Sequence, residues 1–101
     1  RLVADDRTVL TLDNGRVFAS APDALAGLIE VRGIGILSIE AIEKSPLTLA
    51  VDLVSPEKVE RLPEPSVTDI LGVDIRLLRL APFEASAPAK VRAALRSPPE
   101  L

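Results

Sequence analysis

Residues 8–19 run TVLTLDNGRVFA, and they carry the clearest structural signal in the chain. Two segments rich in β-branched and aliphatic residues, 8–12 and 16–19, flank Asp13-Asn14-Gly15. Asn-Gly between two such segments favours a β-hairpin, because both residues tolerate the positive φ angles of a tight turn. We therefore expect antiparallel β structure here and a fold organised around sheets.

The composition excludes several kinds of catalytic and structural site. The chain has 101 residues, 48% of them hydrophobic, and it contains no Cys, His, Met, Trp or Tyr. Without Cys or His, the chain cannot form a zinc finger, a disulfide scaffold, a thiol nucleophile or a Ser-His-Asp triad. Any catalysis must rest on carboxylates, Arg, Lys, hydroxyls or backbone groups. The length predicts a single domain over residues 1–101, and the apolar share argues against disorder.

The charge and hydropathy patterns argue against nucleic-acid and membrane partners. The net charge is −3, which offers no general attraction to nucleic acid or anionic lipid. No uncharged run is longer than seven residues, so no segment is apolar enough to span a bilayer. We expect no membrane association and a cytoplasmic protein, with which the absence of cysteine is compatible.

Outside the hairpin, the pattern predicts short elements along the whole chain. The apolar run at residues 2–4 predicts a buried strand, and Leu25, Leu28 and Ile29 are spaced as in one or two helical turns over residues 24–29. The order of the remaining expected elements is a strand following Gly35, a turn or short helix at 41–45, a strand at 47–54, a proline-rich surface connection at 55–66, a strand at 73–80 and a helix that Ser86 caps and Ser97-Pro98-Pro99 end. Strands followed by a terminal helix predict a sheet-dominated α+β or α/β domain.

The first candidate site is the pair Asp5-Asp6, at the expected end of the strand at residues 2–4. Adjacent residues on an extended chain point to opposite faces, so the two carboxylates would have different roles. One would hold a metal ion or its water, while the other would accept a proton from a substrate hydroxyl. The alternative is a solvated strand end with Arg7 as the local counter-charge.

The second candidate is the segment Glu30-Val31-Arg32-Gly33-Ile34-Gly35-Ile36. On an extended segment Glu30 and Arg32 share a face, so an acidic metal ligand and a cationic phosphate ligand would converge on one substrate. Gly33 and Gly35 would permit close backbone approach. The alternative is an exposed Glu-Arg pair before a glycine bulge. No G-x-x-x-x-G-K-[ST] phosphate loop occurs in the chain.

Three segments together resemble the HPr kinase/phosphorylase family. Residues 28–36, LIEVRGIGI, resemble the family signature, and residues 1–7, RLVADDR, resemble its Walker B segment. Residues 83–92, FEASAPAKVR, resemble the short alphaproteobacterial form, which lacks the usual N-terminal domain. The resemblance implies a P-loop, PEP-carboxykinase-like α/β catalytic domain. That domain would phosphorylate a serine of HPr or an HPr-like phosphocarrier, using ATP and Mg²⁺, in regulation of the sugar phosphotransferase system.

The resemblance also implies roles for individual residues. Asp6 would be the base that takes the serine proton, and Asp5 would support the metal, with the assignment between them uncertain by one position. Glu30 matches the family's Mg²⁺ ligand, and residues 29–38 match the stretch important for kinase and phosphorylase reactions. Val59-Glu60-Arg61-Leu62 is similar to the family's Asp-Arg-Leu segment, which makes Arg61 the expected catalytic arginine. By its surroundings alone, Arg61 would be a surface counter-charge.

The chain also departs from the family pattern. The family's first strand, its Walker A loop, the following helix and a catalytic His are expected before Arg1. Where many members have a Gly-rich basic loop used in dephosphorylation, this chain has Gly72-Val73-Asp74-Ile75-Arg76-Leu77, without a second glycine. Arg76 and Arg79 would either contact phosphate or flank a strand. Many family members form hexamers, so a homo-oligomer is expected. The alternative function is a non-catalytic interaction or regulatory module of the same fold.

Overall fold

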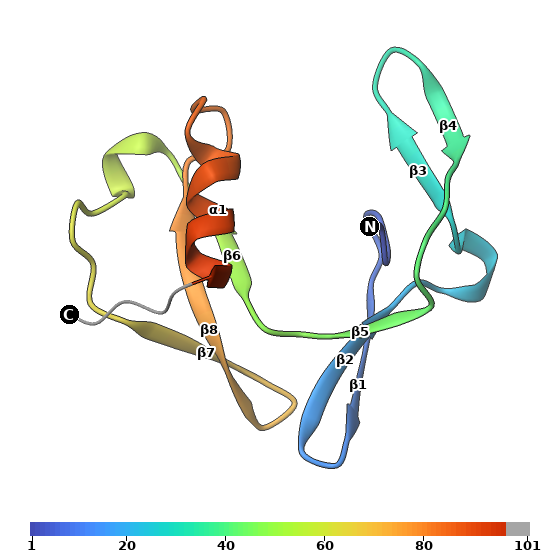
Figure 1. The fold of residues 1–101 in the computed structure, drawn as a ribbon, viewed down its shortest axis with the longest axis horizontal. Coiled ribbons are helices and arrows are strands. Elements are labelled where there is room, and N and C mark those ends of the chain that lie inside the picture. Colours follow the sequence, from blue (N-terminus) through green and yellow to red (C-terminus); the bar gives the residue numbers. More distant parts are fainter. Residues whose placement is uncertain (97–101) are drawn as a thin grey trace. The chain divides into compact units, whose positions relative to one another are not determined.

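In the computed structural model, which describes residues 1–96, the Asn14-Gly15 turn closes the predicted hairpin. Strand β1 (Val9–Asp13) pairs antiparallel with β2 (Arg16–Ser20), and both turn residues have positive φ, 50° and 75°. These angles are those of a two-residue type I′ turn. Strand β5 (Lys44–Pro46) pairs with the end of β2 that is distant from the turn, which gives the sheet order β1-β2-β5 (Figure 1).

The chain divides into two compact units, Arg1–Leu47 and Thr48–Leu101. Besides the β1-β2-β5 sheet, the first unit contains the single-turn helix η1 (Asp23–Leu25) and a second antiparallel hairpin. This hairpin consists of β3 (Leu28–Val31) and β4 (Gly35–Ser38). The strand expected after Gly35 is therefore confirmed.

Three expectations for the first unit are wrong. The helix over residues 24–29 is limited to η1, because Gly27 turns the chain with φ 75° and Leu28 then begins β3. The strand at residues 2–4 is reduced to one parallel bridge between Leu2 and Ala41, since no other described segment pairs with it. Residues 41–45 form neither a helix nor an isolated turn, because Lys44 begins β5 against β2.

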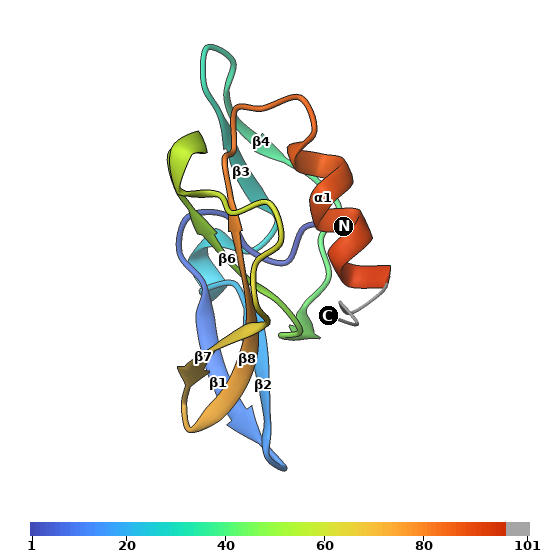
Figure 2. The ribbon, with the colours of Figure 1, turned by 90° about the vertical axis from the view of Figure 1, so that its left-hand side faces the viewer.

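The second unit contains a three-stranded sheet of order β6-β8-β7 (Figure 2). Strand β8 (Val73–Leu80) fills its predicted range and pairs parallel with β6 (Ala50–Leu53) and antiparallel with β7 (Ser66–Ile70). The strand predicted at 47–54 is thus shorter than expected, because only four of its residues meet β8. The connection predicted at 55–66 contains the single-turn helix η2 (Pro56–Lys58), and its last residue begins β7, which the sequence did not predict.

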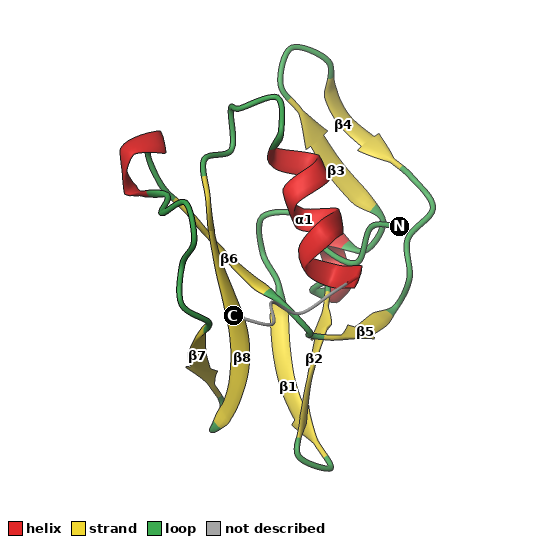
Figure 3. Cartoon of the chain, turned by 60° about the vertical axis from the view of Figure 1, so that its left-hand side comes forward, coloured by secondary structure: helices red, strands yellow, loops and turns green. Residues whose placement is uncertain are grey.

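Helix α1 (Ala87–Arg96) confirms the predicted C-terminal helix, while its expected end at Ser97-Pro98-Pro99 lies outside the described residues. It returns beside β8 (Figure 3). The guanidinium of Arg76 on β8 donates a hydrogen bond to the carbonyl oxygen of Ala94 in this helix. Leu95 of this helix is 59% exposed. No helix among residues 1–96 is long and apolar enough to cross a membrane.

Buried hydrophobic residues are few and unequally divided between the units. In the described part of the chain they are Val17 in the first unit and Ile75, Leu80, Ala81 and Ala87 in the second. Val17 lies on β2, the central strand of its sheet, and Ile75 and Leu80 lie on β8, the central strand of theirs. The core of each unit is therefore built around its central strand.

Candidate functional site

The first unit contains a hollow of about 340 Å³ that brings both acidic motifs together. Asp5, Asp6 and Arg7 line it from the segment before β1, and Glu30 lines it from β3. The remaining lining residues are apolar: Leu25, Leu28, Ile29 and Ile36. Asp5, Asp6 and Glu30, which the sequence offers as two separate candidate sites and the resemblance joins, therefore line a common space.

A direct hydrogen bond joins the two motifs. The backbone amide of Glu30 donates to Oδ2 of Asp5 at 3.0 Å. Glu30 is paired with Ile36 of β4, and in an antiparallel ladder alternate residues direct their amides away from the neighbouring strand. The outward amide of Glu30 thus meets the Asp5 carboxylate, which fixes Asp5 to β3 although residues 2–4 form no strand.

The carboxylates of the hollow differ in what they contact. Asp5 is engaged with β3, whereas within residues 1–96 no hydrogen bond or ion pair to the exposed Asp6 carboxylate is found. The Glu30 side chain is also exposed. Asp5 is therefore held against β3, whereas the side chains of Asp6 and Glu30 face solvent.

The hollow offers carboxylate oxygens to the metal ion that the sequence leads us to expect. Among residues 1–96, no three carboxylates converge closely enough to form a metal cluster. Mg²⁺ is commonly held by one or two carboxylates together with waters and substrate phosphates, so it does not need such a cluster. The oxygen chemistry of Asp5 and Glu30 fits an ion of that kind, with the rest of the coordination supplied by substrate.

The turn between β3 and β4 changes the interpretation of Arg32. Arg32 and Gly33 are the central residues of a turn closed by the Ile34 amide, which donates to the Val31 carbonyl at 2.9 Å. Arg32 is therefore not on an extended segment with Glu30, and the expectation that both share a strand face is wrong. The turn follows β3 directly, because the central residues of a tight turn cannot also pair in the ladder between β3 and β4.

Gly33 and Gly35 have φ angles of 85° and 128°, which L side chains rarely adopt. Backbone conformation alone thus gives a reason for glycine at both positions. A Cβ atom at either residue would meet no atom within 4 Å. The space beside both glycines is open, which leaves room for a ligand to approach the backbone as the sequence predicts.

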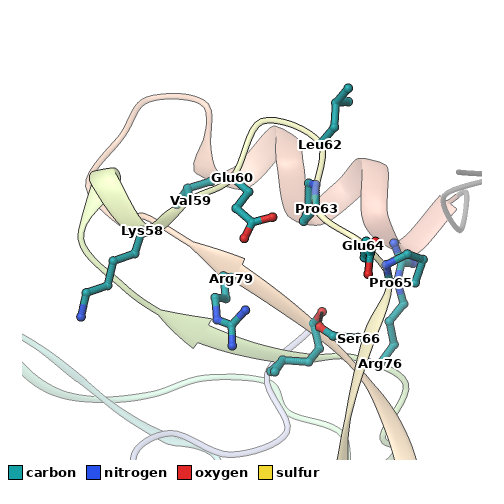
Figure 4. A pocket seen from close by; sticks show the side chains of 11 residues that line it. Lys58, Val59, Glu60, Leu62, Pro63, Glu64, Pro65, Ser66, Arg76 and Arg79 are labelled. Atoms are coloured by element: carbon teal, nitrogen blue, oxygen red, sulfur yellow. Dashed lines mark hydrogen bonds between the residues drawn. The ribbon is translucent and has the colours of Figure 1, made fainter.

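The second unit has a hollow of about 660 Å³ between the loop after η2 and strand β8 (Figure 4). Its charged lining residues are Lys58, Glu60, Glu64, Arg76 and Arg79. In Figure 4 the carboxylate of Glu60 and the guanidinium of Arg79 extend into the same space. Arg61 is exposed and does not line this hollow. Arg61 belongs to the second unit, whereas Asp5, Asp6 and Glu30 belong to the first.

Two features of these sites were not found from the sequence. Arg7 lines the first hollow beside the carboxylates, although its position suggested only a counter-charge. Glu57 accepts hydrogen bonds from its own backbone amide and from the Ser55 side chain, and both lower the pKa of this exposed carboxyl below its usual value. The Ser-Pro-Glu order at residues 55–57 is a usable sequence signal for the second feature, since it is typical of a helix start.

Comparison with known proteins gives consistent relatives. No family model matches the chain. The HPr kinase/phosphorylase of Polaromonas naphthalenivorans is 41% identical over 88 residues, which cover 74% of this chain and 28% of that protein. The HPr kinase/phosphorylase of Bordetella pertussis is 40% identical over 91 residues, 78% of this chain and 30% of the relative. This chain thus spans less than a third of the length of these relatives.

A solved structure is also similar. The Hpr(Ser) kinase/phosphatase from Coxiella burnetii matches with a TM-score of 0.78 and 25% sequence identity, and the match covers 95% of this chain and 66% of that one. Sequence and structure comparisons therefore agree on one kind of relative.

Proposed function

Because this chain is a relative of the HPr kinase/phosphorylases, we propose that it carries the catalytic carboxylates of a serine kinase acting on HPr or an HPr-like phosphocarrier. The observation that carries this proposal is the hydrogen bond from the Glu30 amide to the Asp5 carboxylate at 3.0 Å. It joins the two acidic motifs around one hollow, which also contains Asp6 and Arg7. Phosphoryl transfer needs a carboxylate near the attacking hydroxyl and charges that neutralise phosphate oxygens.

In this proposal each charged residue of the site has a separate role in phosphoryl transfer. Asp6 accepts the proton of the substrate serine as the serine hydroxyl attacks the phosphate. The carboxylate of Asp6 has no described partner that would compete with this hydroxyl. Asp5 positions Glu30 through the backbone. Glu30 and the remaining oxygen of Asp5 would hold Mg²⁺, which when bound would supply positive charge to the nucleotide phosphates. Outside the lining of the hollow, the resemblance supports phosphate-binding roles for Arg32, in the turn after β3, and for Arg61 of the second unit, and a close approach of the nucleotide to the backbone at Gly33 and Gly35.

Nucleotide binding in this proposal depends on sequence outside the chain. Residues 1–101 contain no G-x-x-x-x-G-K-[ST], and backbone amides of such a loop are the usual cradle for nucleotide phosphates. The kinase acts in regulation of the sugar phosphotransferase system, as a homo-oligomer of the hexameric kind expected from the resemblance. Phosphorolysis of the phosphoserine is the second activity that the site would support, through return of the proton from Asp6.

The proposal is tested on the full-length protein with ATP, Mg²⁺ and an HPr-like phosphocarrier from the same organism. Mass spectrometry should find one phosphate on a serine of the phosphocarrier, dependent on both ATP and Mg²⁺. A phosphocarrier that another serine kinase can modify is the positive control. Absence of transfer to that competent phosphocarrier would contradict the proposal, and binding without transfer would favour the non-catalytic interaction module.

A further inference from the structure

Strand β1 is an exposed sheet edge without the usual protection. All five of its residues are exposed, including Val9 at 40%, Leu10 at 38% and Leu12 at 53%. It stands at the end of the order β1-β2-β5 and pairs only with β2 among the described residues. Natural edge strands commonly avoid further pairing through charged side chains, especially lysine, through proline or through a bulge. The sequence Val-Leu-Thr-Leu-Asp of β1 has no lysine or proline, and its one charged residue, Asp13, stands at its end beside the turn.

The free edge directs a defined set of backbone groups outward. Leu12 is paired with Val17, whose carbonyl oxygen accepts a hydrogen bond from the Leu47 amide at 2.8 Å, on the side away from β1. Leu12 and Val17 are therefore a non-hydrogen-bonded pair of the hairpin. By alternation, the amides and carbonyls of Leu10 and Leu12 point to the free edge, while those of Thr11 point to β2.

We propose that this edge pairs antiparallel with β1 of a second copy of the same chain, in a register centred on Leu10. In this register Leu10 stands opposite Leu10 of the other copy, and Thr8 stands opposite Leu12. These are the positions that direct backbone groups outward, so each such pair exchanges two hydrogen bonds. If the register were shifted by one residue, the outward amides and carbonyls of one copy would face residues of the other copy whose amides and carbonyls are already bonded to β2.

The side chains are self-complementary in this register. Leu10 and Leu12 of both copies form one continuous apolar row, and Val9 stands opposite Thr11 on the other face. Asp13 of each copy stands opposite Arg7 of the other, so opposite charges meet at both ends. No like charges face each other between residues 7 and 13. The pairing concerns assembly and does not depend on the proposed kinase activity.

Disulfide formation tests the register directly. The chain contains no cysteine, so Leu10→Cys introduces a single thiol in the 101-residue chain. Directly opposed residues of an antiparallel hydrogen-bonded pair have Cα atoms about 5.5 Å apart, within the range of a disulfide. Mild oxidation should yield at least about tenfold more covalent dimer than for Val67→Cys. Val67 is a matched control, because it is 57% exposed on the edge strand β7 of the other unit.

A charge substitution and hydrogen exchange distinguish two partners for the edge of β1: a second copy of the chain and a strand of the same molecule. Leu10→Lys places two ammonium groups opposite each other and should weaken self-association by about tenfold or more, as measured by sedimentation, whereas Val67→Lys should not. The Leu10 and Leu12 amides should become protected from exchange only as protein concentration rises. Equal protection at all concentrations would assign the edge to a strand within the same molecule. That result, or equal cross-linking of the two cysteine variants, would overturn the proposal.

Discussion

The Oδ2 atom of Asp5 lies 3.0 Å from the backbone nitrogen of Glu30, which stands 25 residues further along the chain. The contact makes two separate sequence motifs into parts of one arrangement. Because the donor is a backbone amide, the side chain of Glu30 stays available to a ligand. A change at Asp5 is therefore expected to move Glu30 as well as remove a carboxylate.

Replacing Asp5 by alanine should release the outward amide of β3. The loss of this bond should reduce the stability of the first unit by about 1 kcal/mol and speed hydrogen exchange at the Glu30 amide. Asp5→Asn should have a smaller effect, because its amide oxygen still accepts a hydrogen bond. The control is Asp74→Ala, at an exposed position of β8. Unchanged exchange at Glu30 in Asp5→Ala would show that the bond contributes nothing in solution.

Replacing Asp6 by asparagine should remove proton acceptance and leave the fold intact. In the full-length protein, kcat for phosphoryl transfer to serine should fall by about 10²–10⁴-fold, the usual contribution of a general base. The free energy of unfolding should stay constant, since Asp6 is exposed and has no described partner. Asp74→Asn removes an equivalent charge from an exposed position of the other unit. If Asp6→Asn retained the activity of Asp74→Asn, Asp6 would not be the base.

Leu71 occupies a strained position in the turn between β7 and β8. Its φ angle is 53° and that of Gly72 is 80°, so leucine stands where Asn or Gly is preferred. Leu71→Asn should stabilise the protein by about 0.5–1 kcal/mol, seen as a rise in Tm. The control is Leu62→Asn, because Leu62 is a loop leucine that is 85% exposed. An equal change in Tm for both variants would attribute the effect to polarity rather than backbone strain.

The Arg76 guanidinium attaches α1 to the sheet through the Ala94 carbonyl. Arg76→Met keeps much of the side-chain bulk but removes the donor, and it should cost about 1 kcal/mol. Arg79→Met is the comparison, because Arg79 pairs with Asp52 at 3.9 Å between side chains that are more than half exposed. Such pairs contribute less than about 1 kcal/mol. Urea unfolding should therefore rank Arg76→Met as the less stable variant.

The lowered pKa of Glu57 makes the stability of the folded protein depend on pH. Hydrogen bonds from its own backbone amide and from Ser55 lower its pKa in the folded state, so its contribution to stability is present above the unfolded pKa, about 4.3. That contribution is lost as the pH falls through the lower folded pKa. NMR titration should show the Glu57 carboxyl titrating below other exposed glutamates, and Ser55→Ala should raise its pKa. A pKa unaffected by Ser55→Ala would exclude this hydrogen bond.

Local chemistry was sufficient to predict the first hairpin but not all of its neighbours. Asn14-Gly15 fixes a turn on its own, and the prediction is confirmed. The spacing of Leu25, Leu28 and Ile29 satisfied a helical period, yet Gly27 turns the chain and Leu28 pairs with Ser38. Strand β7 escaped prediction because its turn begins with Leu71, a residue that seldom adopts positive φ.

The sequence predicted which residues belong to the candidate site better than it predicted how they are arranged. Asp5, Asp6 and Glu30 were expected together, and they line one hollow. The bond between Asp5 and the Glu30 amide depends on the register of β3 against β4, a pairing that local residue preferences do not determine. The position of Arg32 also depends on where that ladder ends. The roles of Arg61, Gly33 and Gly35 stay predictions.

The uneven burial of apolar side chains has a consequence for how ligands would be detected. Of the hydrophobic residues buried in the described part of the chain, only Val17 belongs to the unit that contains the acidic hollow. A unit with so little buried apolar surface has small unfolding enthalpy and heat-capacity changes of its own. A ligand that binds its folded form stabilises it by RT ln(1 + [L]/Kd), a large gain relative to a small intrinsic stability. Occupancy of the hollow should therefore be detected with high sensitivity in the whole protein, as a rise in the melting temperature of this unit.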